Sequence, residues 1–306
     1  MTLVLFLIDM EEIARDVAVV PMTIVNAYLV GNAQSWVLVD SGSPGNAKKI
    51  REAAESRFGP NAKPKGIILT HGHFDHASSA PELAKLWDVK VYAHRLEWPF
   101  LTGKSAYPPL DPTAPGFFSA ISRFMPSRTA NVADRIADLN GSLPSLGLSD
   151  WEIIDTPGHT PGHVSFFRAR DGVLLAGDAF ATVNMDSFVD LVSKKPEVSR
   201  PATPGTYDWP KARVSVQTLA KLRPKVIGAG HGVPMTNAAT GLEKLAANFP
   251  VPEHGRYVTE PALFDENGIT YLPPAPPDNL PKVAGGVAAA VALAAAGAFL
   301  LKLRRK

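Results

Sequence analysis

The stretch of sequence that decides the fold is His71-Gly72-His73-Phe74-Asp75-His76, which packs three imidazoles and a carboxylate into six residues. It directly follows residues 66–70, an apolar and β-branched run that predicts a strand. On a loop after this strand, side chains at alternate positions can converge, whereas within a strand they would point to opposite faces of the sheet. Neutral imidazole and carboxylate together suit Zn²⁺ and, less exclusively, Fe or Mn. We therefore predict a metal site at the end of this strand.

Three more residues of metal-binding type lie where predicted strands end, and they are His159, Asp178 and His231. Each lies in a loop that glycine or proline makes tight, so distant loops can bring ligands to one edge of the sheets. Together with the first motif, the candidate ligands are His71, His73, Asp75, His76, His159, Asp178 and His231. A catalytic Zn²⁺ takes three protein ligands and keeps one position open. Seven ligands therefore predict two metal ions.

The order of predicted elements indicates two sheets covered by helices. Periodicity and turn signals predict strands at 17–20, 23–30, 36–39, 66–70, 89–93, 151–154, 164–168, 173–176 and 226–228. They predict helices at 46–58, 79–86, 209–222 and 238–247, and a loop for the histidine motif. Residues 95–130 mix prolines with aromatic side chains and form an insertion. We predict that it is a lid with apolar walls for an acyl or aromatic substrate, the alternative being a packed surface excursion.

The motifs HxHxDH, TPGH, GD and GH, in this order, resemble the metallo-β-lactamase superfamily of dinuclear metallohydrolases over about residues 15–250. The resemblance implies an α/β fold, a four-layer αββα sandwich with the metals at one end of the two sheets. It implies a first metal held by His71, His73 and His159. It implies a second metal held by Asp75, His76 and His231, with Asp178 bridging the two.

The charges of such a centre predict the chemistry. Two Zn²⁺ ions roughly 3.5 to 4 Å apart can share a hydroxide as nucleophile, because coordination lowers the pKa of water to about 7. One metal would polarise the substrate carbonyl and the other would stabilise the leaving group. The predicted catalytic residues are Asp178, as the bridge, and Asp75, which could also relay a proton to the leaving group. We therefore predict a dinuclear zinc hydrolase that cleaves an ester, lactone or thioester bond of a small molecule.

Two relatives of this type match the sequence incompletely. Lactonases of acyl-homoserine lactones often place a tyrosine soon after the bridging aspartate, where this chain has residues 179–182 without one. Glyoxalase II-like thioesterases share TPGHTPGH, but their basic glutathione-binding residues are not evident after His231. A mononuclear iron oxidoreductase of the persulfide dioxygenase type and a phosphodiesterase or nuclease of the same superfamily remain alternatives.

The composition of the chain indicates which classes of substrate and metal ligand to expect. The formal net charge of +2 gives no broad field to attract nucleic acid, so we expect a small-molecule substrate and no nucleic acid. Without cysteine, any metal must be held by His, Asp, Glu or water. The oligomeric state is left open.

Two residues near the motifs have more than one interpretation. Asp40 either orients a ligand imidazole or caps the helix that begins near Asn46. His163 lies four residues after His159, but an eighth ligand has no vacancy in the family scheme. We therefore expect His163 to support the site or to pack in the interior.

The chain divides by composition into a catalytic domain at 1–255, a Pro-rich linker at 256–282, a transmembrane helix at 283–301 and a basic tail at 302–306. A helix over 283–301 would be roughly 28 Å long, close to the roughly 30 Å bilayer core. A buried helix or a disordered Ala-rich tail are the alternatives. We expect a membrane protein with a single-pass C-terminal anchor and a catalytic domain on the cytoplasmic side, although the basic tail favours the opposite orientation.

Overall fold

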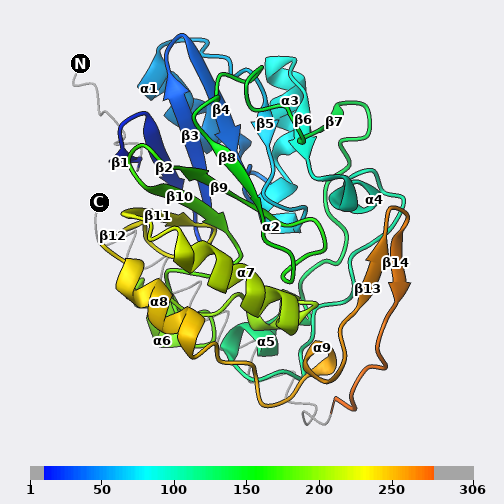
Figure 1. Cartoon of the computed structure of the whole chain (residues 1–306). Coiled ribbons are helices and arrows are strands. Elements are labelled where there is room, and N and C mark those ends of the chain that lie inside the picture. Colours follow the sequence, from blue (N-terminus) through cyan, green and yellow to red (C-terminus); the bar gives the residue numbers. More distant parts are fainter. Residues whose placement is uncertain (1–9, 279–306) are drawn as a thin grey trace, which may run out of the picture. The chain divides into compact units, whose positions relative to one another are not determined.

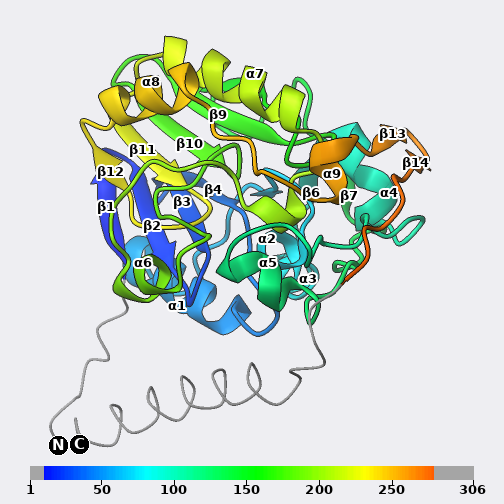
Figure 2. The same cartoon turned by 90° about the horizontal axis from the view of Figure 1, so that it is seen from below.

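The structure is a computed structural model that describes residues 10–278. The chain divides into two compact units, Met1–Pro274 and Ala275–Lys306. The first unit contains every helix and strand named below, and Figures 1 and 2 show it in two views.

The first sheet has seven strands in chain order. They are β1 (Glu11–Ala14), β2 (Val17–Pro21), β3 (Asn26–Asn32), β4 (Ser35–Val39), β5 (Ile67–Ile68), β6 (Val91–Ala93) and β7 (Ile136–Asp138). β1 to β4 form an antiparallel meander, while β4 to β7 pair in parallel. Parallel neighbours need crossover connections, which α1 (Ala47–Phe58) and α3 (Ala80–Trp87) provide. The loops that follow β4 and β5 therefore lie at the same edge of the sheet.

The second sheet has five strands in the order β12-β11-β10-β9-β8. Their bounds are β8 (Glu152–Asp155), β9 (Val164–Arg168), β10 (Val173–Gly177), β11 (Val226–Ala229) and β12 (Met235–Thr236). β10 and β11 are parallel, and α7 (Trp209–Lys221) lies in the connection between them. The residues after β10 and after β11 thus also share one edge, which positions two of the predicted ligand loops together.

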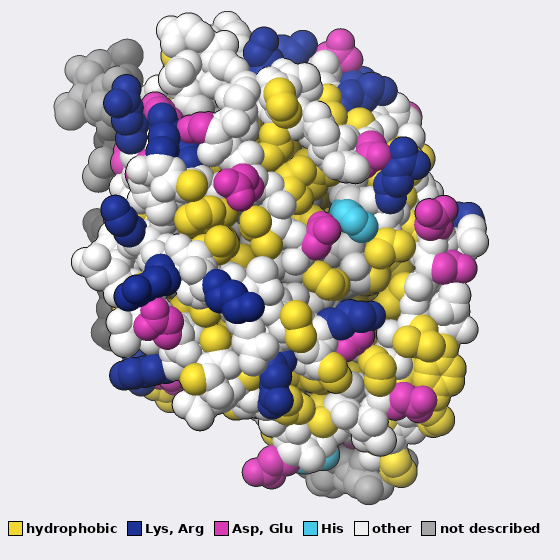
Figure 3. All heavy atoms as spheres, in the orientation of Figure 1, with side chains coloured by type: hydrophobic (Ala, Val, Ile, Leu, Met, Phe, Trp, Pro, Cys, Tyr) yellow, Lys and Arg dark blue, Asp and Glu magenta, His cyan; other side chains and the backbone are white. Residues whose placement is uncertain are grey.

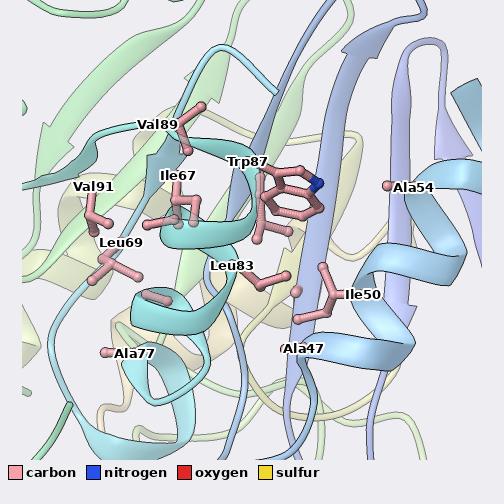
Figure 4. Close-up of a cluster of buried hydrophobic side chains, with 14 of the residues drawn as sticks. Ala47, Ile50, Ala54, Ile67, Leu69, Ala77, Leu83, Trp87, Val89 and Val91 are labelled. Atoms are coloured by element: carbon pink, nitrogen blue, oxygen red, sulfur yellow. The ribbon is translucent and has the colours of Figure 1, made fainter. Parts of the chain in front are cut away.

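Helices cover the outer face of each sheet. On the first sheet, Ile50 of α1 and Leu83 of α3 pack with Ile67 and Leu69, as Figure 4 shows. On the second sheet, α7 and α8 (Ala239–Ala247) pack their buried apolar side chains against β10 and β11.

A third apolar core lies between the two sheets. It joins Val19 and Val37 of the first sheet to Phe166 and Leu175 of the second. Adjacent residues of β10 point to opposite faces, so Leu175 faces this core whereas Leu174 faces α7 and α8. The order is therefore helices, sheet, sheet and helices, and the predicted mixed α/β fold with two covered sheets is confirmed.

The structure differs from the sequence-based prediction inside the histidine motif. The motif is not entirely a loop, because residues Phe74–Ala77 form the single-turn helix α2. The carbonyl of His73 accepts hydrogen bonds from the backbone N–H groups of His76 and Ala77. Asp75 and His76 therefore lie on a helical turn and not on the extended loop that was predicted.

Several short elements had no signal strong enough to predict. They are η1 (Arg95–Glu97), α4 (Trp98–Leu101), α5 (Phe117–Ser122), α6 (Phe188–Ser193), η2 (Thr203–Gly205), α9 (Arg256–Thr259), β13 (Leu263–Asp265) and β14 (Gly268–Tyr271). The last three fall in the predicted linker, where Tyr257 and Phe264 pack against Phe100, Tyr107 and Tyr207. The division into domains stays a prediction.

The predicted membrane location through a single-pass C-terminal anchor is wrong. Among residues 10–278, no helix is both long enough and apolar enough to cross a bilayer. The longest, α7, has 13 residues and measures roughly 20 Å, against a bilayer core of roughly 30 Å. The predicted hydrophobic helix at 283–301 and the basic tail lie outside the described residues. The prediction of a cytoplasmic side rested on this anchor and is withdrawn with it.

Candidate metal centre

All seven predicted ligands converge at the edge where the two sheets meet the loops after β5, β8, β10 and β11. They form three overlapping groups of potential ligand atoms, each with its atoms within 4.8 Å of one another. The groups are His71 with His73 and His159, His71 with His76 and Asp178, and Asp75 with His76 and His231. That these residues bind metal stays a prediction. The geometry shows whether their donor atoms suit a metal ion.

The first group brings three imidazole nitrogens to one point. His73 Nδ1 lies 3.1 Å from His71 Nε2 and 3.0 Å from His159 Nε2. Burial lowers the pKa of all three side chains, to about 3 for His73 and well below the usual range for His71 and His159. The rings are therefore neutral at physiological pH. A neutral imidazole is the form that binds a metal ion.

The outward ring nitrogens of this group are held by hydroxyl groups. His71 Nδ1 lies 3.1 Å from Thr70 Oγ1, and His159 Nδ1 lies 3.2 Å from Thr206 Oγ1. His73 Nε2 lies 3.0 Å from the Tyr207 hydroxyl. When the outward nitrogen donates its proton to such a partner, the inward nitrogen presents a lone pair. The first group thus has the donor arrangement that a metal ion requires.

The second group is centred on the carboxylate of Asp178. Asp178 Oδ2 lies 3.0 Å from His231 Nε2 and 3.5 Å from His159 Nε2, while Oδ1 lies 3.4 Å from His76 Nε2. Asp75 Oδ2 lies 3.5 Å from the same nitrogen of His231. One carboxylate therefore reaches both histidine groups, as a bridging ligand would.

Two buried atoms of the second group have no partner other than each other. His76 Nε2 and Asp178 Oδ1 lie 3.4 Å apart and make no other polar contact within the described part of the chain. Burial lowers the pKa of His76, but the carboxylates of Asp178 and Asp40 outweigh burial and raise it well above its usual range. A buried polar atom without a partner costs roughly 1 to 3 kcal/mol. A cation between these atoms would remove that cost, so the residues fit a second metal ion.

Asp40 supports this group, as one of its two interpretations predicts. Its Oδ2 lies 2.9 Å from His76 Nδ1, and its Oδ1 accepts the backbone N–H of Thr70 at 2.8 Å. The N-cap of α1 is Asn46, so Asp40 does not cap that helix. The carboxylate orients a ligand imidazole and ties it to the strand that precedes the motif.

His163 is not an eighth ligand, because both of its ring nitrogens are engaged elsewhere. Its Nε2 accepts the backbone N–H of Asp178 at 2.8 Å, and its Nδ1 lies 2.8 Å from Thr156 Oγ1. Burial lowers its pKa to about 4, which keeps Nε2 free to accept. His163 therefore positions the backbone of Asp178, the predicted bridging residue.

Gly230 allows the ligand loops to approach closely. A Cβ at this position would clash with the carboxylate of Asp178 and would lie 2.6 Å from Cε1 of His76. Only a residue without a side chain fits between them. The glycine before His231 is thus explained by close packing at the site.

Sequence reasoning missed Glu97, which connects two ligand loops. The side chain is buried, with Oε2 accepting the backbone N–H of Gly72 at 2.9 Å and Oε1 accepting that of Gly162 at 2.7 Å. Tyr107 also donates its hydroxyl to Oε2. Burial raises the pKa of Glu97, while these donors oppose the rise. Gly72 lies between His71 and His73, so Glu97 holds their loop against the loop that carries His159.

We expect Glu97→Gln to weaken metal binding in the first group by 10- to 100-fold, the usual effect of losing a residue that supports a ligand. The amide can accept only one of the two backbone N–H groups and turns its own donors toward the other. Competition with a chelator measures the affinity. The matched control is Tyr107→Phe, which leaves both backbone bonds of Glu97 in place and should have a smaller effect. Unchanged affinity in Glu97→Gln would show that the carboxylate does not position the ligands.

A pocket opens onto the candidate metal centre, and the predicted insertion lines it. The centre contributes His73, Asp75, His159, Asp178 and His231. From residues 95–130 come Tyr107, Leu110, Phe118, Met125, Pro126 and Ser127. Figure 1 shows α5 below α2, and the ring of Phe118 on α5 lies 6.4 Å from that of His231. The insertion thus forms a wall of the site, as its apolar composition predicts.

Tyr207 is a second residue that the sequence did not reveal. It is buried, its hydroxyl lies against His73, and it lines the same pocket. It comes from the segment between η2 and α7, close in the chain to no predicted ligand. Its only sequence signal is its position before Asp208, which caps α7.

Comparison with known proteins agrees with this geometry. A family model described as the metallo-beta-lactamase superfamily matches residues 20–231. The probable metallo-hydrolase YflN of Bacillus subtilis (strain 168) is 40% identical over 243 residues, covering 77% of this chain and 91% of YflN. Hydroxyacylglutathione hydrolase GloC of Haemophilus influenzae is 28% identical over 167 residues, covering 53% of this chain and 71% of GloC. A metallo-beta-lactamase family protein of known structure from Thermus thermophilus is similar in fold, with a TM-score of 0.51 and 23% identity over 78% of this chain and 80% of that one.

Proposed function

The chain belongs to the metallo-β-lactamase superfamily, and from this premise we propose that it is a hydrolase with two metal ions that cleaves an ester, lactone or thioester bond of a small molecule. The observation that carries the proposal is the pair of histidine groups joined by the carboxylate of Asp178. The similarity to a probable metallo-hydrolase over most of both chains supports the reaction class.

The proposed division of labour follows from the geometry. His71, His73 and His159 would hold one ion, Asp75, His76 and His231 the other, and Asp178 both. When bound, the two ions would supply two things: a water molecule whose pKa is lowered, and positive charge beside the scissile carbonyl and the leaving group.

Side chains of the protein would transfer a proton, exclude water and hold the ligands in place. Asp75 lines the pocket, so its carboxylate can carry a proton to the leaving group. Leu110 and Phe118 line the same pocket as the candidate ligands and would limit the access of bulk water. Asp40 and His163 hold His76 and Asp178 in place while the charges at the centre change.

The donor set favours Zn²⁺ as the resident metal. Five imidazoles and two carboxylates are ligands that zinc accepts, and Fe or Mn would also fit them. Cysteine, which would favour softer metals, is absent from the sequence.

A small molecule fits the surface better than nucleic acid. On the face shown in Figure 3, Lys and Arg side chains are interspersed with Asp and Glu and with hydrophobic side chains. A nucleic-acid site would instead gather one sign of charge along a face or groove.

The test is a panel of matched esters, lactones, thioesters and phosphodiesters given to the protein loaded with Zn²⁺, Mn²⁺ or Fe²⁺. We expect hydrolysis of at least one of the first three classes, and none after chelation. The same assay on His159→Ala controls for contaminating hydrolases. Cleavage of the phosphodiester alone, or of nothing, would overturn the proposal.

A further inference from the structure

Apart from the candidate metal centre, most of the pocket lining is apolar. The apolar side chains include Leu110, Phe118, Met125, Pro126 and Ala202. Phe118 and Ala202 are buried and belong to one hydrophobic cluster with Met125. A substrate group that enters this space therefore exchanges water for hydrocarbon, which favours apolar groups.

Two tyrosine hydroxyls in the lining are already paired within the protein. The Tyr207 hydroxyl donates to the carbonyl of Pro108 at 3.1 Å and faces His73 Nε2, from which it can accept. The Tyr107 hydroxyl donates to Glu97 and accepts the backbone N–H of Gly72 at 3.0 Å. Neither tyrosine has a donor to spare for a charged group on a substrate.

Among the described residues that line the pocket, none is a Lys or Arg that could pair with an anionic substrate. Arg123 and Arg128 flank the lining residues 125–127 in sequence, but neither belongs to the lining. A carboxylate on the far end of an acyl group would therefore be buried without a partner, which is costly.

We propose that the substrate is uncharged on its acyl side, and that its apolar acyl chain lies against α5 and Met125. This inference rests on the proposed function and adds the substrate class. It excludes substrates whose acyl group ends in a carboxylate.

The test uses two acyl chains of equal length on one leaving group, hexanoyl and the adipoyl monoanion, in whichever bond class the metal-loaded protein cleaves. We expect kcat/KM to favour hexanoyl by on the order of 100-fold, because the carboxylate would be buried unpaired. From acetyl to hexanoyl, kcat/KM should rise by up to about fourfold per methylene. S-lactoylglutathione, whose acyl group is short and carries a hydroxyl, should be a poorer substrate than a hexanoyl thioester.

A positive charge placed in the pocket should weaken the preference. Met125→Lys is expected to lower kcat/KM for hexanoyl and to raise it for adipoyl, so that their ratio falls at least tenfold. The matched control is Val214→Lys, which adds the same charge on an exposed part of α7 and should leave the ratio unchanged.

The outcomes separate the two proposals. Equal hydrolysis of both chains, or preference for adipoyl or S-lactoylglutathione, would overturn the substrate class while the hydrolase stands. Absence of hydrolysis by fully metal-loaded protein would overturn the proposed function, and the substrate class with it.

Discussion

Replacing Asp178 by Asn is expected to lower kcat/KM by about a thousandfold, equivalent to about 4 kcal/mol of transition-state stabilisation. Its two oxygens reach His76, His159 and His231, so it contacts both histidine groups. An amide keeps the shape of the side chain but removes the negative charge that two cations would share. We therefore also expect one of two bound metal ions to be lost. Steady-state kinetics and elemental analysis of the same sample measure both effects.

The control for this substitution is Asp134→Asn, which removes a carboxylate whose side chain is 81% exposed. It should leave the kinetics and the metal content unchanged. A thermal scan of Asp178→Asn should show a folded protein, because the substitution is nearly isosteric. If the Asp178→Asn protein keeps two metal ions and its full kcat/KM, Asp178 is not the bridge.

Removal of the metals is expected to abolish hydrolysis and to lower the melting temperature. Two ions, each present at a hundred times its dissociation constant, add about 5 kcal/mol of stability. For a chain of this size that corresponds to roughly 10 to 20 °C. Without a metal, His76 Nε2 and Asp178 Oδ1 have no partner other than each other, at 3.4 Å. Differential scanning calorimetry before and after dialysis against a chelator measures the shift.

Restoring the ions should reverse both losses. Zn²⁺ should recover activity and melting temperature, whereas Mg²⁺ should not, because it prefers oxygen ligands in octahedral geometry. Full activity in protein that has been shown to be metal-free would contradict the proposed chemistry.

The seven predicted ligands could be found from sequence because each follows a strand and carries a strong donor. His71 and His73 were recognised by their spacing, and His159, Asp178 and His231 by the glycines and prolines beside them. Parallel pairing at β4–β5 and at β10–β11 then brings these loops to one edge. Local pattern and sheet topology agree here, so the convergence of the ligands was predictable.

The residues that support the ligands were not predictable, because their partners are distant in sequence. Glu97 is 25 residues from Gly72 and 65 from Gly162, and a single carboxylate within an insertion has no motif. Tyr207 lies 134 residues from His73, with which it pairs. Only the folded chain shows which group pairs with the ring nitrogen of each imidazole that points away from the candidate metal centre.

The predicted helices and strands differ from the observed ones where tertiary contacts override local signals. Residues 256–271 read as the start of a proline-rich linker, yet Tyr257 and Phe264 pack against Tyr107 and Tyr207. The turn of α2 was missed because it has four residues and is formed by backbone bonds to His73. Helices this short carry too little periodicity to detect.

If one carboxylate joins two metal sites, each chain should bind two metal ions. A titration of chelator-stripped protein with Zn²⁺, followed by elemental analysis after gel filtration, counts them. We expect the unaltered protein to retain two equivalents and His231→Ala to lose one of them. Retention of a single equivalent by the unaltered protein, or of none, would contradict the two-metal centre.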